Sequence, residues 1–224
     1  MRNKYLAFGI LIGGKSTRFG ADKGLFKLGS KHLIEYQLDI LQELNSDVFL
    51  IANDKTQVQS YIDEINFHTV TGFIVDEYDF DLDRSIRSPM IGLYSAFKDL
   101  KRLNYEKFFA LSCDNPLIKI EVIKFLIQKG EDYDCVVPRW KNQFLEPLFA
   151  IYPIKKGYYR SLNCIRNRLF KLTNLIDPIW NTYYIPIENL IKKIDPYLLS
   201  FKNLNTNNDI EAIEKHLIME EKLE

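Results

Sequence analysis

The segment from Gly9 to Lys23, GILIGGKSTRFGADK, combines closely spaced glycines with three basic side chains. Glycine lets a backbone approach a bound phosphate closely, and lysine and arginine can neutralise the phosphate charge. The first eight residues match the P-loop pattern G-x-x-x-x-G-K-[ST]. The segment therefore raises the question of which kind of phosphate-binding loop this is.

A true P-loop makes tight turns at its four variable positions, which here are Ile10, Leu11, Ile12 and Gly13. Three large apolar residues in a row favour a buried strand over such turns. The lysine of a P-loop also opens a helix, but glycines at positions 20, 24 and 29 disfavour a helix here. We therefore predict a strand up to Ile12 and a loop that begins at Gly13.

Three other polar residues come directly after apolar runs. Asp114 follows KFFALSC, Asn53 follows VFLIA, and Asp76 follows FIV. An aspartate that faces a triphosphate can hold Mg²⁺, and a carboxylate also complements the paired N–H donors of guanine. The alternative role of each residue is to form a turn, or for Asp114 to cap a helix.

The elements that would position these residues alternate along the chain. Strands are predicted at 5–12, 48–52, 73–75 and 107–112, and helices at 32–44, 56–65, 90–103 and 120–129. Such alternation predicts an α/β fold with a Rossmann-like, mostly parallel sheet and helices on both faces. Ligands of such sheets bind outside the carboxyl ends of the strands, where the residues above are expected.

The second half departs from this pattern. Strands at 134–138 and 146–153 are joined by a short polar connection and are expected to form a small antiparallel addition. A helix after Lys155, a strand near 182–185 and a final helix capped by Asn207 or Asn208 complete the prediction. No linker or repeat divides the chain, so residues 1–224 are predicted to form a single domain.

Composition limits the possible partners. With 46% hydrophobic and 27% charged residues the chain is expected to fold, and its 30 basic and 30 acidic residues give no general affinity for nucleic acid or anionic lipid. The three cysteines show no CxxC pair, so buried thiols are expected. The N-terminal apolar run meets Gly-Gly-Lys instead of a cleavage site and is too short to cross a membrane, which predicts a cytoplasmic protein.

The segment from residue 11 to 23 resembles the signature L-x-G-G-x-S-x-R-x-G-x-D-K of molybdenum cofactor guanylyltransferases, which are MobA-like NTP transferases of the sugar-phosphate nucleotidyltransferase type. Residues 113–116 resemble the family's C-D-x-P, 147–152 its P-L-x-A-x-Y, and 201–210 its F-x-N-x-N-T-x-x-D-L. The resemblance thus extends from residue 11 to residue 210. It implies the fold of nucleotide-diphospho-sugar transferases.

The resemblance also implies an activity: transfer of GMP from GTP to the phosphate of molybdopterin, with Mg²⁺ as cofactor and release of pyrophosphate. Arg18, Lys23 and Asp114 would be catalytic, and Asp114 would also bind the metal. The implied nucleotide-binding residues are Leu11, Ile12, Gly13, Gly14, Lys23, Asn53, Asp76 and Asp114. Asn203 and Asn205 would lie on the acceptor side, and their alternative role is to cap the last helix. Transient contact with other proteins of molybdenum cofactor biosynthesis, or with acceptor proteins, is implied as well.

Two features depart from the family pattern. Ser88 stands where the family has the first glycine of G-P-L-x-G-I, and the preceding acidic segment is long, which is consistent with a lid, a different acceptor or a solvated loop. Glu77 takes the role of Asp76 if the alignment shifts by one residue. The alternatives are a molybdopterin cytidylyltransferase, transfer to another small phosphate, and a regulator that binds nucleotide without chemistry. The loop of the cytidylyltransferases usually reads A-A-G where this chain has Ile12, Gly13 and Gly14, and Gly13-Gly14 together with the Asp22-Lys23 ending favour GTP.

Overall fold

The computed structural model describes residues 4–13, 22–65, 68–78, 86–206, 209–211 and 213. Within them the strands are β1 (Leu6–Leu11), β2 (Lys27–Leu28), β3 (Lys31–His32), β4 (Asp47–Ala52), β5 (Val70–Val75), β6 (Lys107–Ser112), β7 (Cys135–Arg139), β8 (Phe149–Pro153) and β9 (Thr182–Pro186). The α-helices are α1 (Leu33–Gln42), α2 (Lys55–Glu64), α3 (Pro89–Arg102), α4 (Ile120–Gly130) and α5 (Ile154–Arg166). Short 3-10 helices lie at η1 (Lys23–Leu25), η2 (Leu172–Leu175), η3 (Ile191–Lys193) and η4 (Leu199–Phe201).

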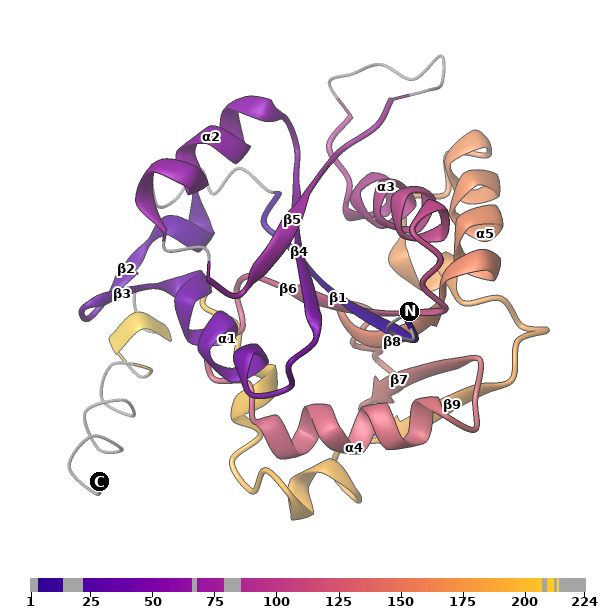
Figure 1. Ribbon diagram of the computed structural model, residues 1–224. Coiled ribbons are helices and arrows are strands. Elements are labelled where there is room, and N and C mark those ends of the chain that lie inside the picture. The colour runs from indigo at the N-terminus through magenta and orange to yellow at the C-terminus, as the bar shows by residue number, and fades with distance from the viewer. Residues whose placement is uncertain are drawn as a thin grey trace.

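A seven-stranded sheet in the order β5-β4-β1-β6-β8-β7-β9 forms the centre of the molecule (Figure 1). β1 runs parallel to both β4 and β6, whereas β8 runs antiparallel to both β6 and β7. The central strands β1, β4 and β6 are almost continuously apolar, as expected where both faces of a parallel sheet are covered. The predicted mostly parallel sheet with an antiparallel addition in the second half is confirmed.

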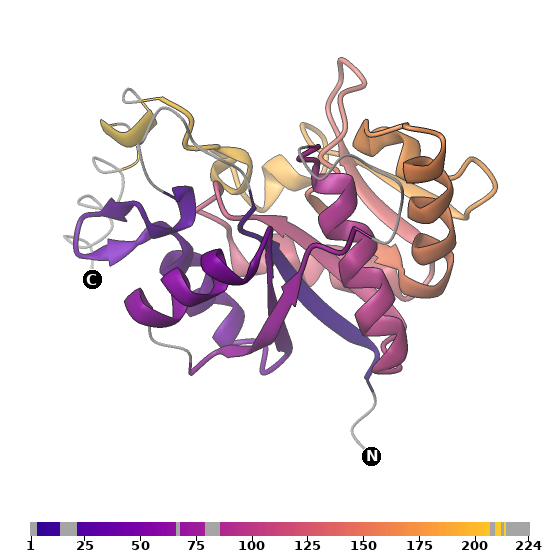
Figure 2. The ribbon, with the colours of Figure 1, turned by 90° about the horizontal axis from the view of Figure 1, so that it is seen from above.

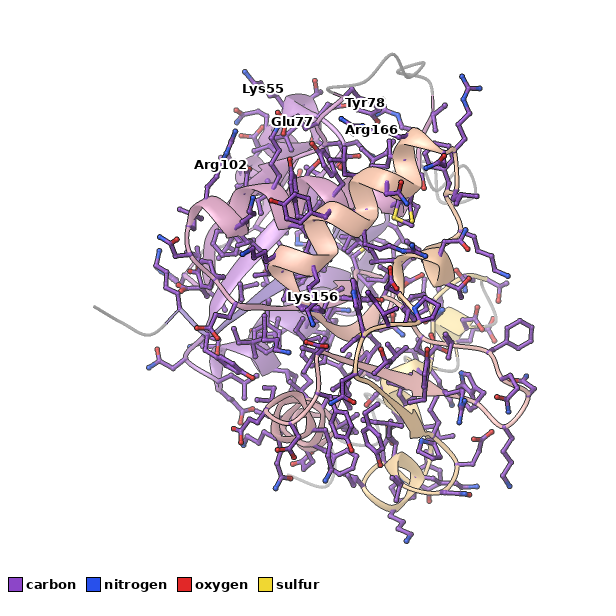
Figure 3. The ribbon with its side chains drawn as sticks, turned by 90° about the vertical axis from the view of Figure 1, so that its right-hand side faces the viewer. Lys55, Glu77, Tyr78, Arg102, Lys156 and Arg166 are labelled. Carbon is purple, nitrogen blue, oxygen red and sulfur yellow. The ribbon has the colours of Figure 1, made fainter. Side chains whose placement is uncertain are left out.

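Helices cover both faces of this sheet, as predicted. On one face α1, α2 and α4 pack over a core that includes Phe8 and Ile10 of β1, and on the other α3 and α5 pack over a core that includes Ala7 and Leu11. The split follows from the alternation of side chains along a strand. α3 and α5 lie side by side along their face, as Figures 1 and 3 show. The three cysteines are buried and form no disulfide.

Two strand boundaries differ from the prediction. β5 begins at Val70, three residues earlier than predicted. The sequence pattern missed its first part because that part contains Gly72, which weakens a strand pattern, and pairs irregularly with β4. β8 begins at Phe149, three residues later, because Phe149 N donates to Glu146 O and closes a turn there. The turn contains Pro147, which has no N–H to contribute to a strand ladder.

A small hairpin that the sequence did not predict precedes α1. β2 and β3 pair antiparallel across a turn in which Gly29 has a φ of 62°, a value that favours glycine. The N-cap of α1 is His32, which forms a capping box with Glu35. Leu28 and Leu33 pack with Leu199, Leu204 and Ile213, so the hairpin lies against a segment from near the other end of the chain (Figure 2).

In the described part of the chain, no helix has the length and apolar character needed to cross a membrane.

Candidate active site

Four of the predicted binding residues follow four adjacent strands. In the order β5-β4-β1-β6, Asp76 follows β5, Asn53 follows β4, Gly13 lies two residues after β1, and Asp114 lies two residues after β6. The backbone ladder continues to these ends, since Asp76 N donates to Ala52 O at 2.8 Å. The residues therefore form a row along one edge of the sheet. From β1 the chain adds β4 and β5 on one side of the sheet and then β6 on the other side of β1, and ligands bind at such a switch in strand order.

One part of this edge is a pocket of about 110 Å³ beneath the N-terminus of α3. It is lined by Leu11, Gly13, Ile51, Asn53, Asp76, Arg87, Ser88, Pro89 and Gly92. The structure thus brings together four of the predicted nucleotide-binding residues. A Cβ atom at Gly13 would lie 2.6 Å from Asn53 Oδ1, so a larger residue here would displace the side chain of Asn53.

Asp76 is the carboxylate of this pocket. Burial raises its pKa to about 7, and the charge on Asp54 also raises it, while the guanidinium of Arg87 opposes the shift. Donors from a ligand would stabilise the charged form of Asp76. The predicted alternative, Glu77, instead accepts a hydrogen bond from Lys98 Nζ of α3 at 2.6 Å and is not among the residues that line the pocket.

Ser88, which replaces the family glycine, has a structural role in this site. Its side chain accepts a hydrogen bond from Met90 N at 3.2 Å and caps α3, and Pro89 occupies the first position of the helix. Serine is a good N-cap residue, so the departure from the family pattern is compatible with the helix start. The acidic residues 79–85 of the preceding segment lie outside the described residues.

Next to the pocket along the edge, side chains from three distant segments meet. Lys23 Nζ lies 3.1 Å from Asp114 Oδ2 and donates to Asn205 Oδ1 at 2.8 Å. The side chains of Lys23 and Asp114 are only 16% and 19% exposed. We call Lys23, Asp114 and Asn205 the lysine cluster. It unites two predicted catalytic residues with one residue predicted for the acceptor side.

The segment that contains Asn203 and Asn205 is held against the loop after β6. Leu204 N donates to Asp114 O at 2.9 Å, and Asn115 Nδ2 donates to Asn203 Oδ1 at 2.6 Å. Among the residues that the structure describes, no hydrogen bond joins the side chain of Asn203 or Asn205 to the backbone of the last helix. The capping bonds there join Thr206 and Asp209 reciprocally, with Thr206 N donating to Asp209 Oδ2 at 2.7 Å. The predicted caps, Asn207 and Asn208, lie outside the described residues.

A network around Gln57 of α2 connects the pocket to the lysine cluster, and the sequence did not predict it. Gln57 Oε1 accepts from Asn53 N at 2.8 Å, while Gln57 Nε2 donates to Ile12 O at 2.9 Å and also to Asp22 Oδ2. Tyr61, one turn further along α2 and fully buried, donates to Asp22 Oδ1 at 2.6 Å. Asp22 in turn caps η1, which begins with Lys23. A glutamine and a tyrosine four residues apart on the helix after Asn53 are the pattern that could have indicated this network.

The remaining predicted residues fall into two groups. Leu11 lines the pocket, whereas the side chain of Ile12 is buried in the core on the opposite face and its carbonyl binds Gln57. Gly14 and Arg18 lie outside the described residues.

The oxygen ligands at this edge fit Mg²⁺. The described residues contain no cluster of three or more His, Cys, Asp or Glu side chains. Mg²⁺ bound to a nucleotide needs only one or two carboxylates because phosphates and water complete its coordination. Asp114 supplies one carboxylate, and Asn205 adds an amide oxygen. Glu146 lies on the same edge, and its pKa is raised by burial and further by the charge on Asp114.

Comparisons with known proteins identify the family of the chain. Residues 9–170 match the model of the MobA-like NTP transferase domain. The chain is 30% identical to the molybdenum cofactor guanylyltransferase of Desulfosudis oleivorans, over 92% of both chains. It is 31% identical to a probable molybdenum cofactor guanylyltransferase of Pyrococcus horikoshii, over 91% of this chain and 96% of that one.

Solved structures show the same fold. The crystal structure of molybdopterin-guanine dinucleotide biosynthesis protein A from Archaeoglobus fulgidus superposes with a TM-score of 0.74 at 25% identity, over 95% of this chain and 99% of the other. A 4-diphosphocytidyl-2C-methyl-D-erythritol synthase from Anaerococcus prevotii gives a TM-score of 0.68 at 12% identity, over 96% of both chains. The predicted nucleotide-diphospho-sugar transferase type of fold is confirmed. The chain belongs to the family of MobA-like NTP transferases.

Proposed function

We propose that this protein is a molybdenum cofactor guanylyltransferase that transfers GMP from GTP to the phosphate of molybdopterin and releases pyrophosphate. The observation that carries the proposal is the row of Asp76, Asn53, Gly13 and Asp114 along one sheet edge. The names of the relatives support the same activity. We further infer that residues 1–224 form a single domain and that the protein is cytoplasmic, as the sequence predicts.

In the proposed reaction, a phosphate oxygen of molybdopterin attacks the α-phosphorus of GTP. The bond from that phosphorus to the bridging oxygen breaks, and pyrophosphate leaves with the electron pair. Because the acceptor is already an anion, it needs no general base from the protein. Catalysis then consists of alignment and charge neutralisation.

The described residues have distinct tasks in this proposal. The pocket with Asp76 and Asn53 holds the nucleoside, and Lys23 exchanges its contact with Asp114 for one with the triphosphate. Asp114 would hold Mg²⁺, whose positive charge would offset the negative charge of the triphosphate. Asn203 and Asn205 face the acceptor side, and Arg18 remains a predicted catalytic residue. Proteins that deliver molybdopterin or receive the product are the expected transient partners.

The test is the release of pyrophosphate from each of GTP, CTP, ATP and UTP, with and without molybdopterin, in the presence of Mg²⁺. We expect release only when GTP and molybdopterin are both present, and none after chelation of the metal. Activity with CTP alone would contradict the guanylyl assignment and leave the cytidylyltransferase alternative. Activity with GTP and a sugar phosphate, but not with molybdopterin, would contradict the acceptor.

A further inference from the structure

The pocket beside α3 is lined by one basic residue, Arg87, that the sequence analysis did not identify. Its walls are largely apolar, and its polar side chains are those of Asn53, Asp76, Arg87 and Ser88. Asp76 and Arg87 thus both line the same small cavity, and the positive charge of Arg87 lies near enough to lower the pKa of the Asp76 carboxyl. Nothing in the family signature accounts for Arg87.

Guanine presents these two groups with complementary edges. Its N1–H and 2-amino groups are neighbouring donors, which suit a carboxylate, while O6 and N7 are neighbouring acceptors, which suit the two parallel N–H donors of arginine. Adenine has a donor amino group in place of O6, and cytosine lacks the second pair altogether. A carboxylate together with an arginine therefore selects guanine by chemistry on both edges of the base.

We propose that Arg87 is a specificity-determining residue that donates to O6 and N7 of the guanine of GTP, while Asp76 accepts from N1–H and the 2-amino group. This inference rests on the proposed function and deepens it, since it names the residue that separates GTP from other nucleotides. The residue acts on the base and not on the phosphates.

The surroundings of Arg87 support this role. Arg87 Nη1 donates to the hydroxyl of Tyr78 at 3.2 Å, and that hydroxyl donates to Ile86 O at 3.3 Å, so the side chain is oriented at the exposed rim of the pocket. The charge of Arg87 also opposes the effect of burial on the pKa of Asp76 and favours the carboxylate that guanine requires.

The experiment compares GTP with two analogues: inosine triphosphate, which lacks the 2-amino group, and 7-deaza-GTP, which has a carbon in place of N7. For each, kcat/KM for pyrophosphate release is measured with molybdopterin, and Kd is measured by calorimetry without the acceptor. The enzymes are the wild type, Arg87→Ala, Arg87→Lys and the control Arg102→Ala. Arg102 is the last residue of α3, about 20 Å along the helix from Pro89, and is exposed (Figure 3).

We expect the wild type to prefer GTP over 7-deaza-GTP about tenfold or more. Arg87→Ala should abolish this preference and leave the preference for GTP over inosine triphosphate intact. Arg87→Lys should behave like Arg87→Ala, because lysine keeps the charge but cannot donate in two parallel bonds. Arg102→Ala should retain the wild-type ratios. A role of Arg87 in folding alone would leave the ratio of GTP to 7-deaza-GTP unchanged.

Equal use of GTP and 7-deaza-GTP by the wild type would overturn the inference. An unchanged ratio of GTP to 7-deaza-GTP in Arg87→Ala would also overturn it. So would a wild-type ratio in Arg87→Lys, because a lysine that restores the preference would act through its charge, as it would on the phosphates. If the wild type binds GTP but does not react with molybdopterin, the proposed function fails. The Kd ratios then still decide the role of Arg87.

Discussion

The two parts of the site are built in different ways. The pocket around Asp76 and Asn53 is formed by residues that directly follow parallel strands, so the sheet itself sets their spacing. The lysine cluster is formed by side chains from three distant segments, and hydrogen bonds between those segments hold them in place. In the proposed function, binding of the nucleoside therefore depends on the scaffold, whereas charge neutralisation depends on contacts between distant segments. Each part is expected to fail differently when it is altered.

The largest effect is expected in the lysine cluster. Asp114→Ala removes the proposed metal ligand and should lower Mg²⁺-dependent turnover about 100- to 1000-fold or more. Stability should fall by about 1–3 kcal/mol, because the largely buried Lys23 loses its carboxylate partner but keeps its hydrogen bond to Asn205. Turnover and thermal unfolding measure the two effects separately. Asp132→Ala, an exposed aspartate just after α4, is the control. Unchanged turnover in Asp114→Ala would remove Asp114 from the metal role.

A pH experiment tests the pocket without any ligand. Because the pKa of Asp76 is raised to about 7 in the folded protein, the folded state binds this proton more tightly than the unfolded state. The contribution of Asp76 to stability is therefore present below about pH 4 and is lost as the pH rises to about 7. Asp76→Asn should remove this loss. Its stability relative to wild type should therefore be about 4 kcal/mol higher at pH 8 than at pH 4. Urea unfolding across this range measures it.

The control for that experiment is Asp63→Asn, on the exposed face of α2, which should keep the wild-type pH dependence. A stability profile of Asp76→Asn that runs parallel to the wild type would show that Asp76 is not desolvated in the pocket.

A single added methyl group at Gly13 tests how the sheet positions the pocket residues. Gly13→Ala places a Cβ 2.6 Å from Asn53 Oδ1 and should displace Asn53. We expect KM for GTP to rise roughly 10- to 100-fold, from a packing cost of about 1–3 kcal/mol. Gly72→Ala in β5 is the matched control, because its nearest neighbour, Phe49, would lie at an ordinary 3.7 Å. Equal KM values for the two variants would argue against a role for this close approach.

The smallest effect is expected where the two parts are connected. Gln57→Ala removes bonds to Asn53, Ile12 and Asp22, so both parts should loosen together. We expect kcat/KM to fall roughly tenfold, which corresponds to about 1.4 kcal/mol, because only part of the roughly 1 kcal/mol per lost bond affects the transition state. Gln59→Ala, exposed on the same helix, should have no effect. A loss confined to KM would mean that Gln57 positions the pocket alone.

The difference between the two parts also explains what the sequence could predict. Residues that follow apolar runs, such as Asp76 and Asn53, were placed correctly on one edge because parallel strands must end together. Gln57 and Tyr61 show only their spacing of one helical turn, and Arg87 shows no local pattern at all, because polar residues on a helix or loop are usually solvated. Their contacts arise only when distant elements pack.

The same limit applies to the smallest elements of the fold. β2 and β3 have two residues each, too few to show a period. Ser88 could be seen in the sequence as a departure from the family pattern, but its function as a helix cap required the geometry around Met90.

The contact between Lys23 and Asn205 spans 182 residues of sequence. At about 5–20 residues per second, a ribosome needs roughly 10–40 s to reach the second residue after the first. The strands and loops of the pocket, between Leu11 and Gly92, are all synthesised well before that time. The residues that line the pocket are thus all present early, whereas the lysine cluster cannot form until residue 205 has left the exit tunnel.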